Sequence, residues 1–259
     1  MAIAMSEPNT SCVEAFPLQL QLWLSPAFPV GSFAYSHGLE WAAGSGRVHD
    51  RETARSWISA LLVHGGPRND AILLAEAWRA VTTLPTSTSP PPALRRGEEK
   101  PGASATGSSR LAACNDLALA LAGGRERYLE ASAQGNAFLA TVRAAWSTPA
   151  FERATEAFSG DAAYPVAVGA AAASCGIPLE ATLRAFLAAL CSNLVSALVR
   201  LAVFGQTDGQ RVLATLAPAI EAQAACAAAS TLDDLGGAAF VSDIAALAHE
   251  TQETRMFRT

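Results

Sequence analysis

The sequence has few charged residues and no concentration of basic ones. Only 16% of its 259 residues are charged, and the formal net charge is −5. Nucleic-acid-binding proteins usually carry a basic stripe or patch. The pair Arg95-Arg96 stands alone in a stretch rich in Pro, Ser and Thr. The composition therefore predicts no nucleic-acid partner.

Paired cysteines and membrane-type segments are also missing. The first ten residues have neither a basic leader nor a long apolar run. Arg184 and Arg200 leave too short an uncharged stretch between them for a membrane span of about 20 residues. We therefore expect a cytoplasmic protein with no membrane partner. The cysteines contain no Cys-x-x-Cys pair, and we expect reduced, mostly buried thiols; they are Cys12, Cys114, Cys175, Cys191 and Cys226.

Recognisable catalytic motifs are absent. The sequence contains no phosphate-binding Gly-x-x-x-x-Gly-Lys-Ser/Thr loop, no Gly-x-Ser-x-Gly elbow and no His-Glu-x-x-His. The acidic pair Asp233-Asp234 stands next to two glycines, which favours capping and turn chemistry over catalysis. The pair Glu126-Arg127 is typical of solvated charges. The sequence therefore predicts a protein that is not an enzyme and that binds no cofactor stably.

Histidines are too few and too scattered to specify a metal site. There are four, and no two are spaced i, i+4, so no single helix is expected to present two imidazoles to a metal. Imidazole does suit nickel, and a site that passes a metal onward binds it weakly. His37 and His249 are therefore weak candidates for transient nickel ligands.

Helical patterns fill most of the chain. Apolar spacing predicts helices over 51–62, from 69 onwards, and over 110–121, 126–146, 165–174, 210–229 and 241–248. A core helix near 179–204 is apolar on nearly all sides, with Pro178 and Gly205 at its ends. Strand-type alternation is missing. The predicted fold class is all-α, a single helical bundle of about eight to ten helices.

Composition divides the chain into a leader, a domain and a tail. We interpret residues 1–13 as a flexible leader, 14–248 as the all-α domain and 249–259 as a C-terminal tail that docks a partner. Residues 82–110 are rich in Pro, Ser, Thr and Gly, so they cannot offset the entropy of ordering, and we expect a flexible insertion. Residues 206–209 are predicted to form a polar loop.

Two stretches are unusual for a helical bundle. Residues 22–40 combine Pro26 and Pro29 with Gly31 and Gly38, which predicts an irregular turn. The tail places two arginines around Met256 and Phe257, and this composition is typical of interface anchors. The alternative is that Phe257 packs onto its own domain.

The turn carries a family resemblance. Its order Ser-Pro-Ala-x-Pro-Val-Gly-Ser, followed by Ser-His-Gly-Leu-Glu at 36–40, resembles the signature of the UreF family of urease accessory proteins. The resemblance continues at 164–166, 176–180, 192–197, 205–211, 249–252 and 255–258. Glu253-Thr254 and Met256 depart from the usual family pattern.

The resemblance implies an all-helical, homodimeric maturation chaperone. UreF-like proteins bridge UreD (also called UreH) to the nickel-carrying GTPase UreG, so that GTP hydrolysis is coupled to nickel insertion into the urease apoprotein. On this basis the turn is expected to face UreG or line the nickel route, through Phe33, Tyr35, Ser36, His37 and Glu40. The expected UreD/UreH-binding residues are Gln206, Thr207, Asp208, His249, Glu250, Thr251, Gln252, Arg255, Met256, Phe257 and Arg258.

Two other classes of function stay open. One is a GTPase-activating regulator of UreG, in which Arg211 or Arg255 would enter the GTPase site in trans. The other is a helical enzyme whose site is assembled from distant residues, which would require a deep polar pocket with perturbed titratable groups.

Overall fold

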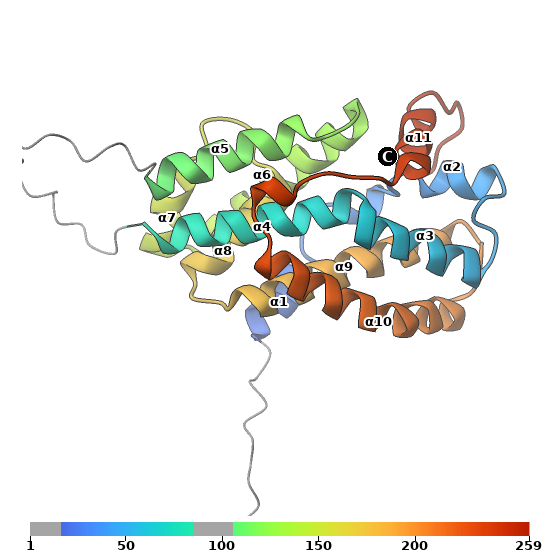
Figure 1. The fold of residues 1–259 in the computed structure, drawn as a ribbon, viewed down its shortest axis with the longest axis horizontal. Coiled ribbons are helices and arrows are strands. Elements are labelled where there is room, and N and C mark those ends of the chain that lie inside the picture. Colours follow the sequence, from blue (N-terminus) through green and yellow to red (C-terminus); the bar gives the residue numbers. More distant parts are fainter. Residues whose placement is uncertain (1–16, 85–105, 259) are drawn as a thin grey trace, which may run out of the picture.

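The computed structural model describes residues 17–84 and 106–258, which form a helical bundle without a strand (Figure 1). The all-α prediction is thus confirmed. The predicted leader and residues 85–105 of the predicted insertion lie outside the described residues. In chain order the elements are α1 (Leu18–Trp23), η1 (Ser32–Ala34), α2 (Leu39–Gly44), α3 (Arg51–His64), α4 (Gly66–Thr82), α5 (Gly107–Ala120), α6 (Arg125–Trp146), α7 (Pro149–Thr155), α8 (Tyr164–Ser174), α9 (Leu179–Arg200), α10 (Gln206–Ala229), η2 (Leu232–Asp234) and α11 (Phe240–His249).

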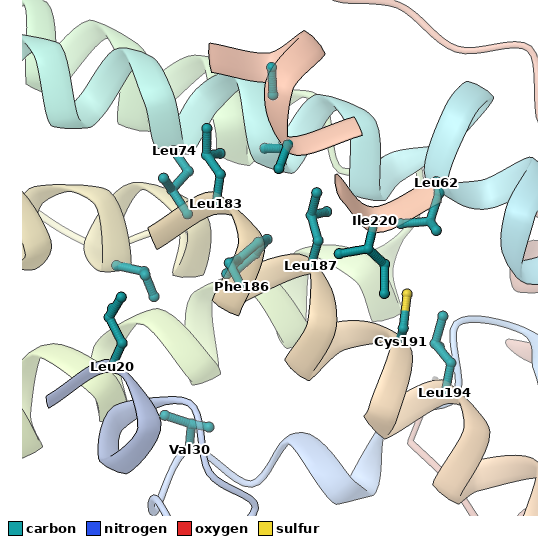
Figure 2. Close-up of a cluster of buried hydrophobic side chains, with 14 of the residues drawn as sticks. Leu20, Val30, Leu62, Leu74, Leu183, Phe186, Leu187, Cys191, Leu194 and Ile220 are labelled. Atoms are coloured by element: carbon teal, nitrogen blue, oxygen red, sulfur yellow. The ribbon is translucent and has the colours of Figure 1, made fainter. Parts of the chain in front are cut away.

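The predicted core helix is α9. In Figure 2 its side chains Leu183, Phe186, Leu187, Cys191 and Leu194 lie among residues of other elements, including Leu20 of α1, Leu62 of α3, Leu74 of α4 and Ile220 of α10. The helix ends at Arg200 rather than near 204. Ala202 adopts a left-handed φ of 57°, and the Val203 N–H bonds back to the Leu198 carbonyl, which closes the helix C-terminus.

By length and composition alone, α9 and α10 are each apolar enough to cross a membrane. Half of the apolar window of α9 is buried inside the bundle, and the core helix of a folded domain meets the same criteria. The apolar pattern of α9 is therefore explained by its place at the centre of the bundle.

Small residues let helices approach closely. A Cβ on Gly169 of α8 would lie 2.3 Å from the Leu74 carbonyl oxygen of α4, and one on Gly135 of α6 would lie 1.9 Å from the Ala162 oxygen. Most of α8 is buried. The Ala-rich composition thus serves backbone-to-backbone packing, which larger side chains would prevent.

Several helix boundaries differ from the predictions. Residues 206–209, predicted as a loop, form the first turn of α10, because Gly205 is the N-cap and Asp208 stands where a carboxylate favours the helix dipole. Pro149 occupies the first position of the short helix α7, where its missing N–H costs nothing. The short helices α1, α2 and α7 were not predicted, since six or seven residues carry too little periodicity.

The capping interpretation holds in the described residues, whereas only two of the four described cysteines are buried. Asp50 and Thr53 form a capping box at the start of α3, and Asp234 accepts the Thr231 N–H at 2.9 Å in a turn. Burial raises the pKa of Cys114 and Cys191 to about 12. Cys175 is half-buried, Cys226 is exposed, and all four described thiols are free.

Candidate functional site

The turn at 31–40 is held by the core helix. Gly31 and Gly38 adopt left-handed φ values of 72° and 74°, a conformation that side chains resist. Between them, the Asn193 side chain of α9 donates to the carbonyls of Ser32 at 2.9 Å and Tyr35 at 3.3 Å. The irregular turn predicted from its prolines and glycines is therefore fixed in place by one amide from the centre of the bundle.

Helix α11 lies directly on this turn. A Cβ on Gly38 would lie 2.7 Å from the Ala246 backbone nitrogen. The contact brings the C-terminal helix against α2, and Figure 1 shows these two helices side by side at one end of the molecule. Gly38 thus meets two requirements, the backbone conformation and the close approach of α11.

The C-terminal tail is anchored on Glu40 of α2. The Glu40 carboxylate accepts the backbone N–H groups of Met256 at 2.7 Å and Phe257 at 2.9 Å. The Arg258 N–H adds a bond of 2.7 Å to the Ala34 carbonyl. Because all three donors are backbone groups, they fix the path of the tail along the turn.

The tail buries one of its two large apolar side chains. Phe257 is only 4% exposed and lies 4.3 Å beneath the Arg200 guanidinium, a cation–π arrangement. Met256 is 61% exposed, as is Phe33 of the turn at 64%. In the isolated chain Phe257 therefore packs onto its own domain, while Met256 and Phe33 face outward.

His249 joins the tail to two helices. It is fully buried; its Nε2 lies 3.1 Å from Glu40 Oε2 and its Nδ1 2.8 Å from Glu126 Oε2. Both ring nitrogens of His249 are thus engaged by carboxylates. Arg255 pairs with the other oxygen of Glu126. The expectation that Glu126 is solvated is wrong, because its carboxylate bridges α6, His249 and the tail.

Titration shifts follow from these contacts. Burial raises the pKa of Glu40, but the N–H donors of Met256 and Phe257 and the His249 imidazole outweigh it and hold that pKa below its ordinary value. Burial and the charge of Glu130 raise the pKa of Tyr35, partly offset by a hydrogen bond from the Arg258 side chain. The Glu40 carboxylate is therefore ionised and the Tyr35 hydroxyl neutral at pH 7.

A second buried charge cluster lies behind the turn. His37, at a left-handed φ of 52°, accepts at Nδ1 from Arg127 at 2.8 Å, and its Nε2 lies 2.9 Å from Glu130. Arg127 also pairs with Glu130 and approaches Asp70 at 3.8 Å. Burial raises the pKa of Glu130, yet Arg127 and His37 lower it to about 2. Arg127, like Glu126, is thus part of a buried network and not a solvated charge.

This cluster lies between two cavities. One has a volume of about 560 Å³ and the other about 290 Å³, and His37, Asp70 and Arg127 line both. Phe33 and Gln206 line the larger cavity, so it reaches the outer part of the turn and the start of α10.

The remaining predicted residues are placed as follows. Ser36 is buried, and its hydroxyl lies 3.4 Å from the Glu40 N–H that donates to it. Asp208 lies between Arg51 and Arg211, so its carboxylate is engaged within its own chain. In the tail segment, Glu250 accepts the Glu126 N–H, Thr251 donates to the Ala248 carbonyl and Gln252 to the Thr254 carbonyl. Thr207 lies in the first turn of α10.

The candidate metal ligands are occupied by protein groups. Both ring nitrogens of His37 and of His249 have partners, and across 17–84 and 106–258 no group of three or more His, Cys, Asp or Glu side chains is arranged to hold a metal. Any metal contact at either ring would have to displace an existing bond.

Sequence reasoning missed several residues that build this site. Asn193 lies in the 192–197 block of the resemblance, but the sequence did not show that this partly buried amide would hold the turn. The local sequence gave no signal that Glu130 and Asp70 belong to this cluster. Their partner Arg127 is 90 residues from His37 along the chain, so spacing alone could not join them.

Comparison with known proteins agrees with the resemblance. A family model described as UreF matches residues 48–217. Proteins named urease accessory protein UreF from Rhodopseudomonas palustris (strain BisB18) and Xanthobacter autotrophicus are 46% and 47% identical to the chain; each alignment covers 93% of this chain and 91% and 90% of theirs. A urease accessory protein UreF 1 from Brucella canis is 44% identical, with 93% of both chains covered. With its helical fold, its turn and its tail, this chain belongs to the UreF family, a family of accessory proteins and not of enzymes.

Proposed function

We propose that the chain is a cytoplasmic maturation chaperone for urease. As a homodimer it would bridge UreD (UreH) and the GTPase UreG to the urease apoprotein, so that GTP hydrolysis is coupled to nickel insertion. Membership of the UreF family supports the urease role. The identity of the partners and the coupling of GTP hydrolysis to nickel insertion are parts of this proposal.

The observation that supports the proposal is that the tail is hydrogen-bonded to the turn and to Glu40 next to it. Glu40 receives the tail backbone at Met256 and Phe257, and Arg258 bonds the carbonyl of Ala34 in the turn. Phe33 and Met256 are left exposed, with the arginines Arg255 and Arg258 in the same segment. Apolar side chains beside guanidinium groups are the usual composition of a binding hot spot.

Exposed and buried members of this surface have different tasks. Phe33 and Met256 are available to touch a partner, whereas Glu40, His249 and Phe257 hold the tail in position. Since the turn and the tail are both held at Glu40, we infer that UreD (UreH) and UreG bind to neighbouring parts of one surface. Substitutions in the exposed set then test contact, and substitutions in the buried set test positioning.

Nickel is treated as cargo in this proposal and not as a resident cofactor. The two cavities that share His37, Asp70 and Arg127 would provide a route past the turn. His37 and His249 already have partners at both nitrogens, so any nickel contact would be transient.

Point variants test the proposal more cleanly than a truncation. Removing everything after Ala248 also removes His249 and Phe257, which would leave the carboxylates of Glu40 and Glu126 without their partners. The double variant Phe33→Ser/Met256→Ser instead changes two exposed side chains. Tagged wild-type and variant chains are incubated with purified UreD and UreG, and capture of each is quantified.

We expect the double variant to lose affinity for at least one of the two partners by about tenfold, as for a pair of hot-spot residues. The control Leu18→Ser/Leu22→Ser replaces two apolar residues of α1 that are 66% and 47% exposed, and it should bind like wild type. Unchanged capture of both UreD and UreG by the Phe33→Ser/Met256→Ser variant would contradict the proposal.

A further inference from the structure

The larger cavity owes much of its volume to small side chains on α9. Residues of α1, of the turn and of the start of α10 line it as well, and between them the small side chains follow one face of α9 at helical spacing. These small residues are Ala185, Ala188, Ala189, Ser192 and Ser196. The volume of about 560 Å³ lies within the range of about 300–1,000 Å³ that is usual for small-molecule sites.

Charge in this cavity is confined to the cluster behind the turn. Among the described residues that line the cavity, four have side chains that can be charged near pH 7: His37, Asp70, Arg127 and Glu130. The rest of the lining is uncharged, and it includes Tyr164 and Phe186, whose ring centroids lie 5.7 Å apart. The cavity therefore combines one charged cluster with a largely apolar remainder.

Hydrogen bonds within the cluster leave out one carboxylate. Glu130 pairs with the Arg127 guanidinium and lies 2.9 Å from His37 Nε2 and 3.0 Å from Gln134 Nε2. Arg127 also donates to His37. In contrast, no residue of 17–84 or 106–258 donates a hydrogen bond to Asp70, and Arg127 Nη2 approaches it only to 3.8 Å, beyond hydrogen-bonding distance.

Asp70 lies where a further donor would be most favourable. Its side chain is 22% exposed and lines both cavities. Burial raises the pKa of Asp70, and the charge of Arg127 offsets this only in part. Arg127 is itself compensated by its ion pair with Glu130. A hydrogen bond between two charged groups is about twice as strong as a neutral one, so a cationic donor would stabilise this carboxylate best.

We propose that the larger cavity binds an organic cation, an alkylammonium group that is anchored on Asp70 with its alkyl chain against the apolar lining. An anionic ligand would meet two carboxylates, and an uncharged apolar ligand would leave Asp70 without a donor. Across the described residues no group of three or more His, Cys, Asp or Glu side chains is arranged to hold a metal ion. The ammonium could belong to a free alkylamine or to a lysine side chain of a bound protein.

Two probes of equal length test the charge. Hexylamine is an ammonium ion at pH 7, whereas hexan-1-ol carries a similar chain without the charge. Binding of each to the full-length chain is followed by NMR titration. We expect hexylamine to bind at least tenfold more tightly than hexan-1-ol, and Asp70→Asn to weaken hexylamine by about tenfold. Asp116→Asn changes an exposed aspartate that lines neither cavity, and it should bind like wild type.

A second variant tests the position of the chain. Ala189→Leu should fill part of the cavity and weaken hexylamine by about tenfold, while Ala222→Leu, on the exposed side of α10, should not. Thermal melts followed by circular dichroism establish that the variants are folded. Equal binding of hexylamine to wild type and Asp70→Asn, or equal binding of hexylamine and hexan-1-ol to wild type, would overturn the inference. Displacement of hexylamine by nickel ions from wild type would also overturn it, since Asp70 would then be a metal ligand.

Competition distinguishes the two sources of the ammonium. If it is a lysine of UreD, UreG or urease apoprotein, saturating hexylamine should reduce capture of that protein by the wild-type chain. Unchanged capture of all three, with hexylamine bound, assigns the site to a free amine. The inference rests on the proposed function only for the choice of these three proteins. Absence of hexylamine binding, with capture still lost in Phe33→Ser/Met256→Ser, would overturn the inference and leave the proposed function standing.

Discussion

Replacing Glu40 by Gln tests how the tail is held. The carboxylate accepts Met256 N–H on one oxygen, and Phe257 N–H and His249 on the other. A glutamine has nearly the same shape but only one oxygen. Whichever way its amide points, an NH2 group faces donors that have lost their acceptor.

The expected cost follows from these bonds. Hydrogen bonds to a charged group contribute about 1.5–3 kcal/mol each, and removing one partner of a buried ion pair costs about 3–5 kcal/mol. Because the three bonds share one group they do not add, and we take about 3 kcal/mol. That free energy changes the docking equilibrium of the tail by about 100-fold.

Hydrogen exchange measures this directly. In wild type the amides of Met256 and Phe257 are bonded to Glu40, so the C-terminal peptide should exchange slowly. In Glu40→Gln we expect its protection to fall by about 100-fold, while peptides of α9 keep theirs, because the change is local.

A matched variant distinguishes the loss of this particular carboxylate from the loss of any negative charge. Glu221 pairs with Arg184 at 2.7 Å but is largely exposed, so Glu221→Gln should change stability by less than about 0.5 kcal/mol. Wild-type protection of the C-terminal peptide in Glu40→Gln would refute the reasoning, since the tail would then be held by contacts other than this carboxylate.

Two further predictions concern packing and pH. Gly169→Ala should lower the free energy of unfolding by about 3 kcal/mol in denaturant melts, because its Cβ would lie 2.3 Å from the Leu74 carbonyl oxygen; Gly44→Ala, with nothing within 4 Å, should not lower it. Acid should release the tail: the Glu40 pKa is depressed in the fold, so its contribution is complete above the ordinary value of 4.5 and is lost as pH falls through the folded pKa. The amide chemical shifts of Met256 and Phe257 should report that transition, and Glu40→Gln should abolish it.

Much of the fold was predictable because local sequence patterns determine the long helices. Long helices such as α6 and α9 carry several turns of apolar spacing, and Asp50 marks the start of α3 within its own first turn. The first turn of α10 was missed because polar residues with a glycine resemble a loop. Gly209 in this turn also packs close to Val195 of α9, a contact between two helices that no local pattern encodes.

The two segments that form the site could be predicted from the sequence, but the long-range contacts between them could not. Composition singled out the turn and the tail, and the structure joins them through Glu40, which is 217 residues from Phe257. It also places Glu126 beside His249, at a separation of 123 residues. No local pattern encodes such pairs, so the sequence assigned turn and tail to different partners, while the fold makes them neighbours.

The central claim is that the exposed side chains of the turn and the tail bind a partner in urease maturation. Nickel incorporation tests this claim most directly. Urease apoprotein is incubated with UreD, UreG, GTP, nickel and either the wild-type chain or Phe33→Ser/Met256→Ser, and nickel bound to the repurified urease is measured by mass spectrometry. The account predicts at least a tenfold loss of nickel incorporation with the variant and none with Leu18→Ser/Leu22→Ser, at equal folded protein. Full nickel loading with Phe33→Ser/Met256→Ser would contradict it.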